Sequence, residues 1–368
     1  MVDGTPPWRA DGSPHGRAAR RRTSRAPCSL EAESLVLRRR LVSTRSPLPE
    51  VVKVVPFARA EARTDARPQA VVIGNFDGVH RGHVAALAQM TALARERGLV
   101  TTVLTFDPHP ALVLGKATPE RLTTLERRIE LFGEHEVERV VVATFSLDFA
   151  ATSPEAFAEQ FLFGELGAEV VVVGADFRFG KGRKGDFETL DALARAHGRR
   201  AFATVLETDD EGAISSTRIR KALGAGRVEH AAALLGRPHA FTGTVEHGQH
   251  KGRTIGFPTA NLARLDEMCP ANGVYAVSVE VEEGAAFRWL GHGVMNIGTR
   301  PTVSDGGKTR HVEIHVFDVD QDLYGRRVRA HVHARVREER KFPSFDELRA
   351  QIERDAAKAR ELTSRLER

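Results

Sequence analysis

Two histidines spaced three residues apart, His80 and His83, lie in the segment GNFDGVHRGH at residues 74–83. An apolar stretch precedes this segment and a helical pattern follows it, so it is expected to join a buried strand to a helix. The amino end of a helix presents unpaired N–H groups and the positive end of the helix dipole, which attract anions. Two imidazoles there would stabilise charge that develops on a polyphosphate during displacement. One such histidine can also be a helix cap or a buried, hydrogen-bonded side chain, but the nearby glycines favour the anion site.

Three further loops carry residues suited to phosphates or to a reacting group. TFDPHP (105–110) is by itself typical of a rigid proline turn, and GADFRFGKGRKGD (174–186) is either a basic loop for phosphates or a solvated surface loop. ISSTRIR (214–220) opens a helix, where Ser216, Thr217 and Arg220 would meet an anion. An N-cap followed by an exposed arginine would give the same pattern.

The second half of the chain contains a glycine-rich stretch that ends in GFPTANL at residues 256–262. Such a stretch can wrap phosphates with backbone N–H groups. Thr259 and Asn261 point the same way on an extended chain, and their oxygens are hard ligands suited to Mg²⁺, although an ordinary turn is the alternative. Glu313 lies in the alternating run VEIHV (312–316), either as a functional carboxylate on the inward face of a strand or as a solvated one facing outward.

Strands alternate with helices from residue 69 to residue 206. The strands are expected at 70–73, 99–106, 139–145, 169–173 and 201–206. Helices are expected at 83–97 and 187–196, and two more begin at the Thr-Pro-Glu of 118–120 and the Ser-Pro-Glu of 153–155. This alternation predicts an α/β fold with a parallel sheet, whose ligands bind beyond the carboxyl ends of the strands.

After a short helix at 227–235 and a linker at 236–238, the pattern changes to short alternating segments. Antiparallel strands are expected at 274–282, 287–294, 311–318 and 327–337, which favours a barrel or a sandwich. A capping box of Ser344 and Glu347 starts a C-terminal helix with one apolar face. The apolar residues of that face are Phe345, Leu348, Ile352, Ala359, Leu362 and Leu366. Domains are therefore expected at 51–236 and 237–368.

The chain has 368 residues, 41% of them hydrophobic, which is enough for two domains with substantial cores. No apolar run approaches the roughly 18–20 residues that a membrane span needs. The two cysteines, Cys28 and Cys269, are far apart in the sequence, so a disulfide framework and a thiolate zinc site are not expected. A reducing cytoplasm is the default location.

The net charge of +5 belongs to the first fifty residues, which carry ten arginines, no lysine and five acids. The remaining chain has 44 basic and 44 acidic residues and lacks the basic footprint of a nucleic-acid-binding protein. Residues 1–50 fit three interpretations: a disordered basic extension, translated sequence upstream of the true start codon, or an arginine-rich transit peptide. Glu31 and Glu33 count against the transit peptide.

Together and in this order, the motifs GNFDGVHRGH, TFDPHP, GADFRFG and ISSTRIR resemble the adenylyltransferase module of bacterial bifunctional riboflavin kinase/FAD synthetases. The resemblance implies a Rossmann-like HxGH nucleotidyltransferase domain that transfers AMP from ATP to FMN and releases pyrophosphate, without a covalent intermediate. His80 and His83 would be its catalytic residues. The other implied site residues are Gly74, Phe76, Asp77, Gly78, Ser216, Thr217 and Arg220 for ATP and its phosphates, and Asp107, Asp176 and Phe177 for the flavin.

GFPTANL, NIGTRPT (296–302), VEIH and LYG (323–325) resemble the riboflavin kinase module of the same family. This implies a small antiparallel β-barrel that phosphorylates riboflavin with ATP and Mg²⁺. The implied roles are metal ligands for Thr259 and Asn261, catalytic base for Glu313, ATP contacts for Gly252 and Arg253, and flavin contacts for Asn296 and Arg300. The resemblance covers residues 69–366, and Val303 stands where an aromatic residue is expected.

The resemblance implies a cytoplasmic enzyme whose partners are riboflavin, FMN and ATP, with no need for nucleic acid or a membrane. Assembly as a homo-oligomer stays open. Two other functions also stay open: an HxGH nucleotidyltransferase with another acceptor and a barrel that only binds, and a non-catalytic flavin-binding regulator. The presence of Thr259, Asn261 and Glu313 together with both histidines favours an enzyme that performs both steps.

Overall fold

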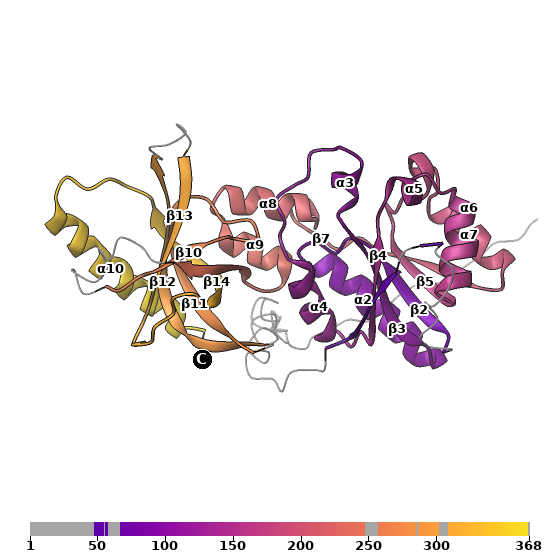
Figure 1. Cartoon of the computed structure of the whole chain (residues 1–368), viewed down its shortest axis with the longest axis horizontal. Coiled ribbons are helices and arrows are strands. Elements are labelled where there is room, and N and C mark those ends of the chain that lie inside the picture. Colours follow the sequence, from indigo (N-terminus) through magenta and orange to yellow (C-terminus); the bar gives the residue numbers. More distant parts are fainter. Residues whose placement is uncertain are drawn as a thin grey trace, which may run out of the picture. The chain divides into compact units, whose positions relative to one another are not determined.

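The computed structural model describes residues 48–54, 56–57, 67–246, 257–284, 286–301 and 308–366 (Figure 1). Gly252, Arg253, Cys28 and nearly all of the expected basic extension lie outside the described residues. The described residues all belong to one compact unit. Within the described ranges, no helix is long and apolar enough to span a bilayer.

The N-terminal domain is built on a six-stranded parallel sheet, as the alternating pattern predicts. Its strands are β1 (Glu50–Val54), β2 (Gln69–Ile73), β3 (Val100–Asp107), β4 (Arg139–Thr144), β5 (Ala168–Gly174) and β6 (Arg200–Thr204). Their order in the sheet is β1-β4-β3-β2-β5-β6. The chain runs from β2 to one side and then returns to place β5 on the other side. The carboxyl ends of β2 and β5 therefore flank the switch point at which such sheets bind ligands.

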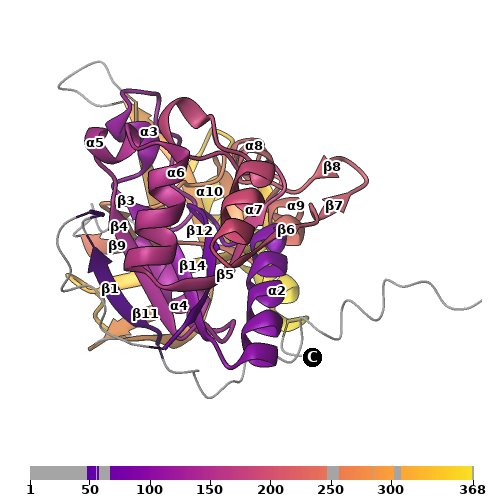
Figure 2. The ribbon, with the colours of Figure 1, turned by 90° about the vertical axis from the view of Figure 1, so that its right-hand side faces the viewer.

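Helices cover both faces of this sheet, because successive side chains of each buried strand point to opposite sides (Figure 2). One face packs on α2 (Arg81–Arg97) and α4 (Leu125–Gly133). The other packs on α7 (Phe187–Ala196) and on the π-helix Phe157–Glu165, which continues α6 (Pro154–Ala156). The short helices α3 (Pro110–Val113) and α5 (Leu147–Ala150) follow β3 and β4.

The edge strand β1 was not predicted from the sequence. It pairs with β4 from Glu50 opposite Arg139 to Val54 opposite Ala143. The N–H of Glu50 donates to the carbonyl of Glu138 at 2.8 Å, and the Glu50 carboxylate pairs with the buried Arg139 guanidinium at 2.8 Å. The sheet therefore begins one residue before the expected domain start at 51.

The helix expected from the Thr-Pro-Glu at 118–120 is wrong, since residues 116–124 form no helix and α4 starts only at Leu125. Long-range hydrogen bonds hold this segment instead. The Asp77 carboxylate accepts from two of its N–H groups, and Arg220 Nε donates to one of its carbonyls at 2.7 Å. The local capping pattern yields to these tertiary contacts.

The C-terminal domain is a closed antiparallel barrel in the order β10-β13-β12-β11-β14-β9. Its strands are β9 (His239–Glu246), β10 (Ala260–Ala263), β11 (Gly273–Glu283), β12 (Ala286–Pro301), β13 (Lys308–Val316) and β14 (Arg327–Glu338). The four predicted strands are confirmed as β11 to β14. β9 and β10, which were not predicted as separate strands, close the barrel.

Helix α10 (Phe345–Ser364) covers part of the outer face of the barrel. Ser344 accepts a hydrogen bond from the N–H of Glu347 at 3.2 Å, as the capping box predicts. The expected face is confirmed in part, since Ala359 and Leu362 pack on the barrel. Phe345 is exposed, whereas Asp355 is buried and pairs with Arg337 at 2.7 Å.

Two helices connect the domains. They are α8 (Ser216–Gly224) and α9 (Val228–Leu235), and the small hairpin of β7 (Thr208–Asp209) and β8 (Gly212–Ala213) precedes them. Ile219 and Leu223 of α8 and Leu234 of α9 join the apolar interior of the barrel in one core. Helix α8, which contains most of the ISSTRIR motif, is therefore packed against the second domain.

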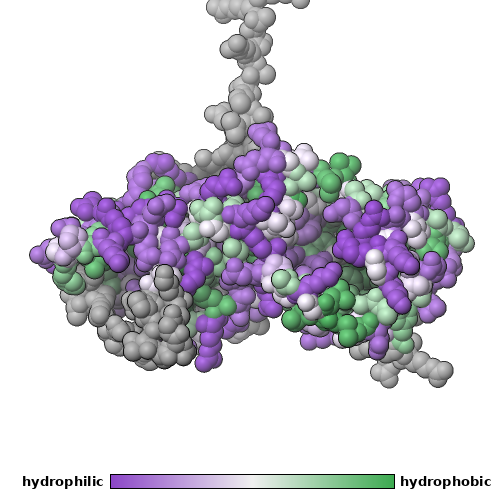
Figure 3. Space-filling view, turned by 90° about the horizontal axis from the view of Figure 1, so that it is seen from above, coloured by the Kyte–Doolittle hydropathy of each residue, from purple (hydrophilic) through white to green (hydrophobic). Residues whose placement is uncertain are grey.

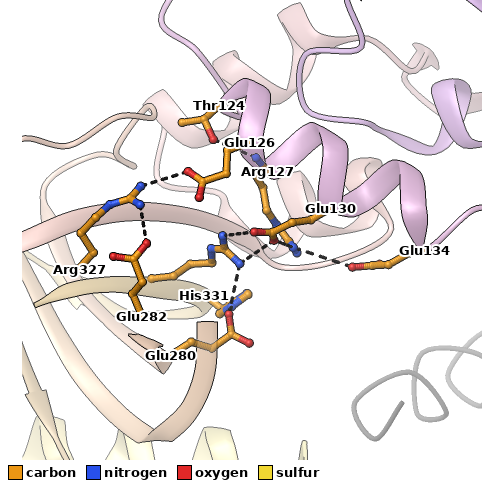
Figure 4. Close-up of polar contacts among 10 residues, drawn as sticks. Thr124, Glu126, Arg127, Glu130, Glu134, Glu280, Glu282, Arg327 and His331 are labelled. Carbon is orange, nitrogen blue, oxygen red and sulfur yellow. Dashed lines mark hydrogen bonds and ion pairs between the residues drawn. The ribbon is translucent and has the colours of Figure 1, made fainter. Parts of the chain in front are cut away.

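Ion pairs link α4 of the N-terminal domain to β14 of the barrel (Figure 4). Arg329 binds both carboxylate oxygens of Glu130 at 2.9 Å and lies 3.5 Å from Glu280. Arg327 lies 3.2 Å from Glu126. Burial alone would raise the pKa of Glu130, but the Arg329 and Arg127 guanidinium groups together outweigh it and hold that pKa below its usual value. The barrel therefore contacts α4 on the side that carries Glu126 and Glu130.

Removing residues 1–54 deletes β1 and leaves the buried Arg139 without Glu50, whereas removing residues 1–47 leaves β1 in place. We expect the first variant to melt several degrees below the second. About 1 kcal/mol corresponds to roughly 2–4 °C in a domain of this size, and the deletion removes a whole edge strand together with the carboxylate partner of the buried Arg139. Calorimetry of both variants measures the difference. Equal melting temperatures would contradict a stabilising role for β1.

Candidate functional site

The loops expected to carry out nucleotidyl transfer lie at the carboxyl edge of the parallel sheet. The loop with the two histidines links β2 to α2, Asp107 ends β3, and Asp176 and Phe177 follow β5. Because β2 lies between β3 and β5, these residues flank the histidine loop on both sides. The fold thus brings three separate motifs to the switch point.

His80 and His83 form a stacked pair at the amino end of α2, with ring centroids 3.7 Å apart and ring planes 16° apart. His80 is the N-cap, and its Nδ1 accepts from the N–H of His83, so the neutral His80 ring carries its proton on Nε2. Gly82 makes room for the stack, because a Cβ there would lie 3.2 Å from His80 Cε1. Phe76 packs against His83 with 5.1 Å between ring centroids.

Both imidazoles are neutral at pH 7. Burial, reinforced by the charge of Arg237, lowers the pKa of His80 to about 4. Burial also lowers the pKa of His83, with smaller contributions from His80, Arg237 and Arg128. Nδ1 of His83 is buried and has no hydrogen-bond partner among the described residues. A neutral imidazole donates one hydrogen bond, so the pair is suited to donate to phosphate oxygens without carrying a charge.

Asp77 holds the histidine loop in place. Its carboxylate accepts from the N–H groups of Leu122 and Thr123, each at 3.0 Å, and pairs with Arg220. Ser216 Oγ donates to the Asp77 carbonyl at 2.8 Å. Asp77 thereby ties the loop after β2 to the segment before α4 and to α8. In this structure the charged groups of Asp77 and Arg220 pair with each other. That either residue contacts a phosphate stays a prediction.

The other residues expected to bind ATP lie in the same loop or at the start of α8. Gly74 donates its N–H to a carbonyl of β3, and Phe76 is buried. Gly78 donates its N–H to Thr123 Oγ1 at 2.8 Å. Thr217, in the first turn of α8, is exposed. Glycine is required at residue 78, where φ is +89°, because the loop turns there in the left-handed region.

In the barrel, three expected site residues lie directly opposite one another on adjacent strands. Asn261 of β10 pairs with Glu313 of β13, which in turn pairs with Asn296 of β12. Such directly paired residues share one face of the sheet, with Cβ atoms about 4.5–5.5 Å apart. Val312 and Ile314 are buried inside the barrel, so Glu313 faces outward and is half-buried. Glu313 therefore faces outward, but instead of being solvated it lies half-buried in a polar row formed by Asn261, Glu313 and Asn296, and its role as a base stays a prediction.

Thr259 directly precedes β10 and lines a pocket together with Val245, Leu323 and Tyr324. The oxygens of Thr259, Asn261 and Glu313 are all hard donors of the kind that Mg²⁺ prefers. No cluster of three or more His, Cys, Asp or Glu side chains in the described ranges could hold a metal ion. A Mg²⁺ ion here would therefore keep waters or substrate phosphates among its ligands. Of Arg300, only the backbone, which pairs with Thr309, is described.

Comparison with known proteins assigns both halves of the chain. The FAD synthetase family model matches residues 62–218, and the riboflavin kinase family model matches residues 235–363. The bifunctional riboflavin kinase/FMN adenylyltransferase of Escherichia coli K12 is 42% identical over 292 residues, which cover 79% of this chain and 91% of that protein. The chain belongs to the bifunctional riboflavin kinase/FMN adenylyltransferase family.

A second relative of the same name, from Bacillus subtilis strain 168, is 39% identical over 296 residues, covering 78% of this chain and 90% of that protein. A crystal structure from Streptococcus pneumoniae, described as a macrolide-efflux protein, superposes with a TM-score of 0.73 and 30% identity. That match covers 83% of this chain and 97% of the other. Family membership confirms the resemblance drawn from the motifs.

Two residues near the histidine pair were not predicted. Arg128 of α4 donates to the carbonyl of Asn75 and to Thr105 Oγ1, and its buried Nε has no partner in the described part of the chain. His109 caps α3, and burial lowers its pKa while the charge of Asp77 opposes that shift. An arginine on a helix is usually solvated, so only the folded structure shows that Arg128 lies near the histidine loop. His109 had a signal in TFDPHP, which we interpreted as a turn.

The residues expected to bind the flavin in the N-terminal domain lie at the same sheet edge. Asp107 and Asp176 are exposed, and Phe177 stacks on Phe179 with 5.5 Å between ring centroids. The surface seen from above is mainly hydrophilic, with hydrophobic patches over the N-terminal domain (Figure 3). Exposed apolar side chains that follow β3 and β4 include Leu112 of α3 and Leu147 of α5. This edge therefore combines apolar and polar groups.

Proposed function

We propose that this chain makes FAD from riboflavin in two ATP-dependent steps. The barrel phosphorylates riboflavin to FMN, and the N-terminal domain transfers AMP from a second ATP to FMN and releases pyrophosphate. The observation that carries the proposal is the presence of both sites in one chain: a stacked, neutral histidine pair at the amino end of α2, and a polar row centred on Glu313 on the barrel.

In adenylyl transfer, a phosphate oxygen of FMN attacks the α-phosphorus of ATP, and the bond to the departing pyrophosphate breaks. His80 and His83 donate hydrogen bonds to the phosphate oxygens, where negative charge grows in the transition state. The amino end of α2 adds its dipole. Arg128, with an unpartnered Nε in the described structure, supplies a nearby positive charge. No side chain needs to form a bond to the nucleotide.

The substrates of this step fit the residues around the histidines. Ser216, Thr217 and Arg220 approach the triphosphate from α8, opposite α2. Arg220 serves the phosphates while it also pairs with Asp77. Asp107, Asp176 and Phe177 contact the flavin, whose apolar ring is suited to the exposed leucines of α3 and α5.

In the kinase step, the Glu313 carboxylate takes the proton from the terminal ribityl hydroxyl of riboflavin as that oxygen attacks the γ-phosphorus of ATP. The bond from the γ-phosphorus to the bridging oxygen breaks, and ADP leaves. Thr259 and Asn261 would hold Mg²⁺, which would supply charge neutralisation on the phosphates. Asn296 lies beside Glu313 and orients the flavin, together with Arg300. Gly252 and Arg253, which lie outside the described residues, contact ATP.

Incubation of the full chain with riboflavin, ATP and Mg²⁺, followed by chromatography of the flavins, tests the whole proposal. We expect FMN to appear first and FAD to follow. FMN without FAD would contradict the transfer step and favour a barrel-only activity. FAD from supplied FMN, without conversion of riboflavin, would contradict the kinase step. Binding without either product would indicate a flavin-binding regulator.

His83→Ala removes one of the two donors at the amino end of α2. We expect FAD formation from supplied FMN to slow by roughly 10²–10³, the usual loss for one electrostatic stabiliser of a transition state. Phosphorylation of riboflavin by the same variant is the control and should be nearly unchanged. Equal loss of both activities would instead assign His83 a role in folding.

Glu313→Gln keeps the size of the side chain and removes the base. Formation of FMN should fall by about 10²–10⁴, the range for loss of a general base. Adenylylation of supplied FMN should persist, because the histidine pair is on the other domain. A variant that still phosphorylates riboflavin at the normal rate would show that Glu313 only stabilises the outer face of the barrel.

A further inference from the structure

The linker between the domains is not a passive connection, because its arginine reaches the histidine loop. Arg237 follows α9 directly, in the Gly-Arg-Pro segment that the sequence presents only as a linker. Its Nη1 donates to the carbonyl of Val79 at 2.9 Å, and its Nη2 donates to the carbonyl of Gly78 at 2.5 Å. Both carbonyls belong to the two residues that immediately precede His80.

We propose that Arg237 is a positioning residue for adenylyl transfer, which acts by holding the carbonyls of Gly78 and Val79 and thereby fixing the turn that presents His80 and His83. This inference rests on the proposed function of the histidine pair. Arg237 lies in the linker and outside the sequence motifs of both domains.

The backbone of this turn needs such support. Gly78 has φ of +89° and Val79 has φ of +40°. A β-branched residue at positive φ is strained and persists only where its surroundings hold it. Val79 is fully buried, and its N–H donates to the carbonyl of Phe76 at 3.0 Å. The Arg237 fork satisfies the two carbonyls that this geometry turns away from the helix.

The charge of Arg237 also acts on the site. Burial of the guanidinium lowers the pKa of Arg237 to about 9, which leaves it protonated at pH 7. Within the described residues it forms no ion pair, and its hydrogen bonds go to backbone carbonyls. A positive charge disfavours the protonated form of a neighbouring imidazole, and Arg237 lowers the pKa of both His80 and His83. The same side chain therefore adds to the effect of burial, which alone is the largest cause of the neutral imidazoles, and adds positive potential near the phosphates.

Arg237 lies in the part of the chain that matches the riboflavin kinase family. The FAD synthetase match ends at residue 218, and the riboflavin kinase match begins at residue 235. Arg237 thus belongs to the segment shared with kinases, yet it supports the loop of the transferase.

The test compares Arg237→Met and Arg237→Lys in the full chain, with kcat and KM of FAD formation measured separately. We expect kcat of Arg237→Met to fall by roughly 10²-fold, as for a misplaced catalytic group, with KM for ATP and FMN changed by less than about threefold. Arg237→Lys keeps the charge but replaces the planar fork by a point donor, so kcat should fall by about tenfold. Phosphorylation of riboflavin should be unchanged in both.

Arg310→Met is the matched control, because Arg310 also donates to two consecutive backbone carbonyls, those of Cys269 and Pro270, but within the barrel. It should leave FAD formation from supplied FMN unchanged. If Arg237→Met does not fold, Arg237→Lys decides the test. A normal kcat in the folded variant, or equal loss of both activities, overturns the proposal. A wild-type chain that makes no FAD would overturn the proposed function itself. A wild-type chain that makes FAD, together with Arg237 variants of unchanged kcat, would overturn this inference alone.

Discussion

The transferase site depends first on one carboxylate. Asp77 accepts hydrogen bonds from two backbone N–H groups of the segment before α4 and pairs with Arg220 of α8, while its own carbonyl accepts from Ser216. Charge-assisted bonds of this kind are the strong ones, and the pair is largely shielded from water. Three parts of the chain that lie far apart in the sequence are thereby joined. With the loop fixed at Asp77, the turn at Gly78 and Val79 and the histidine stack follow within a few residues.

Helix α4 connects this site to the barrel because one side of the helix contacts the histidine loop and the other contacts β14. Arg128 points to the histidine loop, where it donates to the carbonyl of Asn75, while Glu130 on the other side binds the Arg329 guanidinium of β14. Removing one partner of a buried pair such as Glu130 and Arg329 leaves an uncompensated buried charge, which is strongly destabilising. Together with Arg237, this pair makes the barrel part of the environment in which the transferase loop folds.

The sequence predicted the parallel sheet, the four long barrel strands and the edge of the sheet that holds the site, because these follow from periodicity and from strand–loop–helix order. It failed where long-range contacts override local preference. The Thr-Pro-Glu at 118–120 has the local features of a helix start, yet hydrogen bonds from this segment to Asp77 and from Arg220 to it accompany a non-helical backbone. The roles of Arg128 and Arg237 could not be predicted, since nothing in the local pattern distinguishes an arginine on a helix or in a linker from a solvated one. For Glu313 the alternation allowed both faces, and only the register across three strands placed it in a polar row.

The central claim is that one chain holds two chemically separate sites, a histidine pair for adenylyl transfer and a polar row for phosphorylation. The most direct measurement mixes equal amounts of His83→Ala and Glu313→Gln proteins with riboflavin, ATP and Mg²⁺ and follows FAD. Each variant retains the step that the other has lost, and FMN can diffuse between molecules, so the mixture should form FAD although neither protein does so alone at a comparable rate. A mixture that forms FAD no faster than either variant alone would contradict the account of two independent sites.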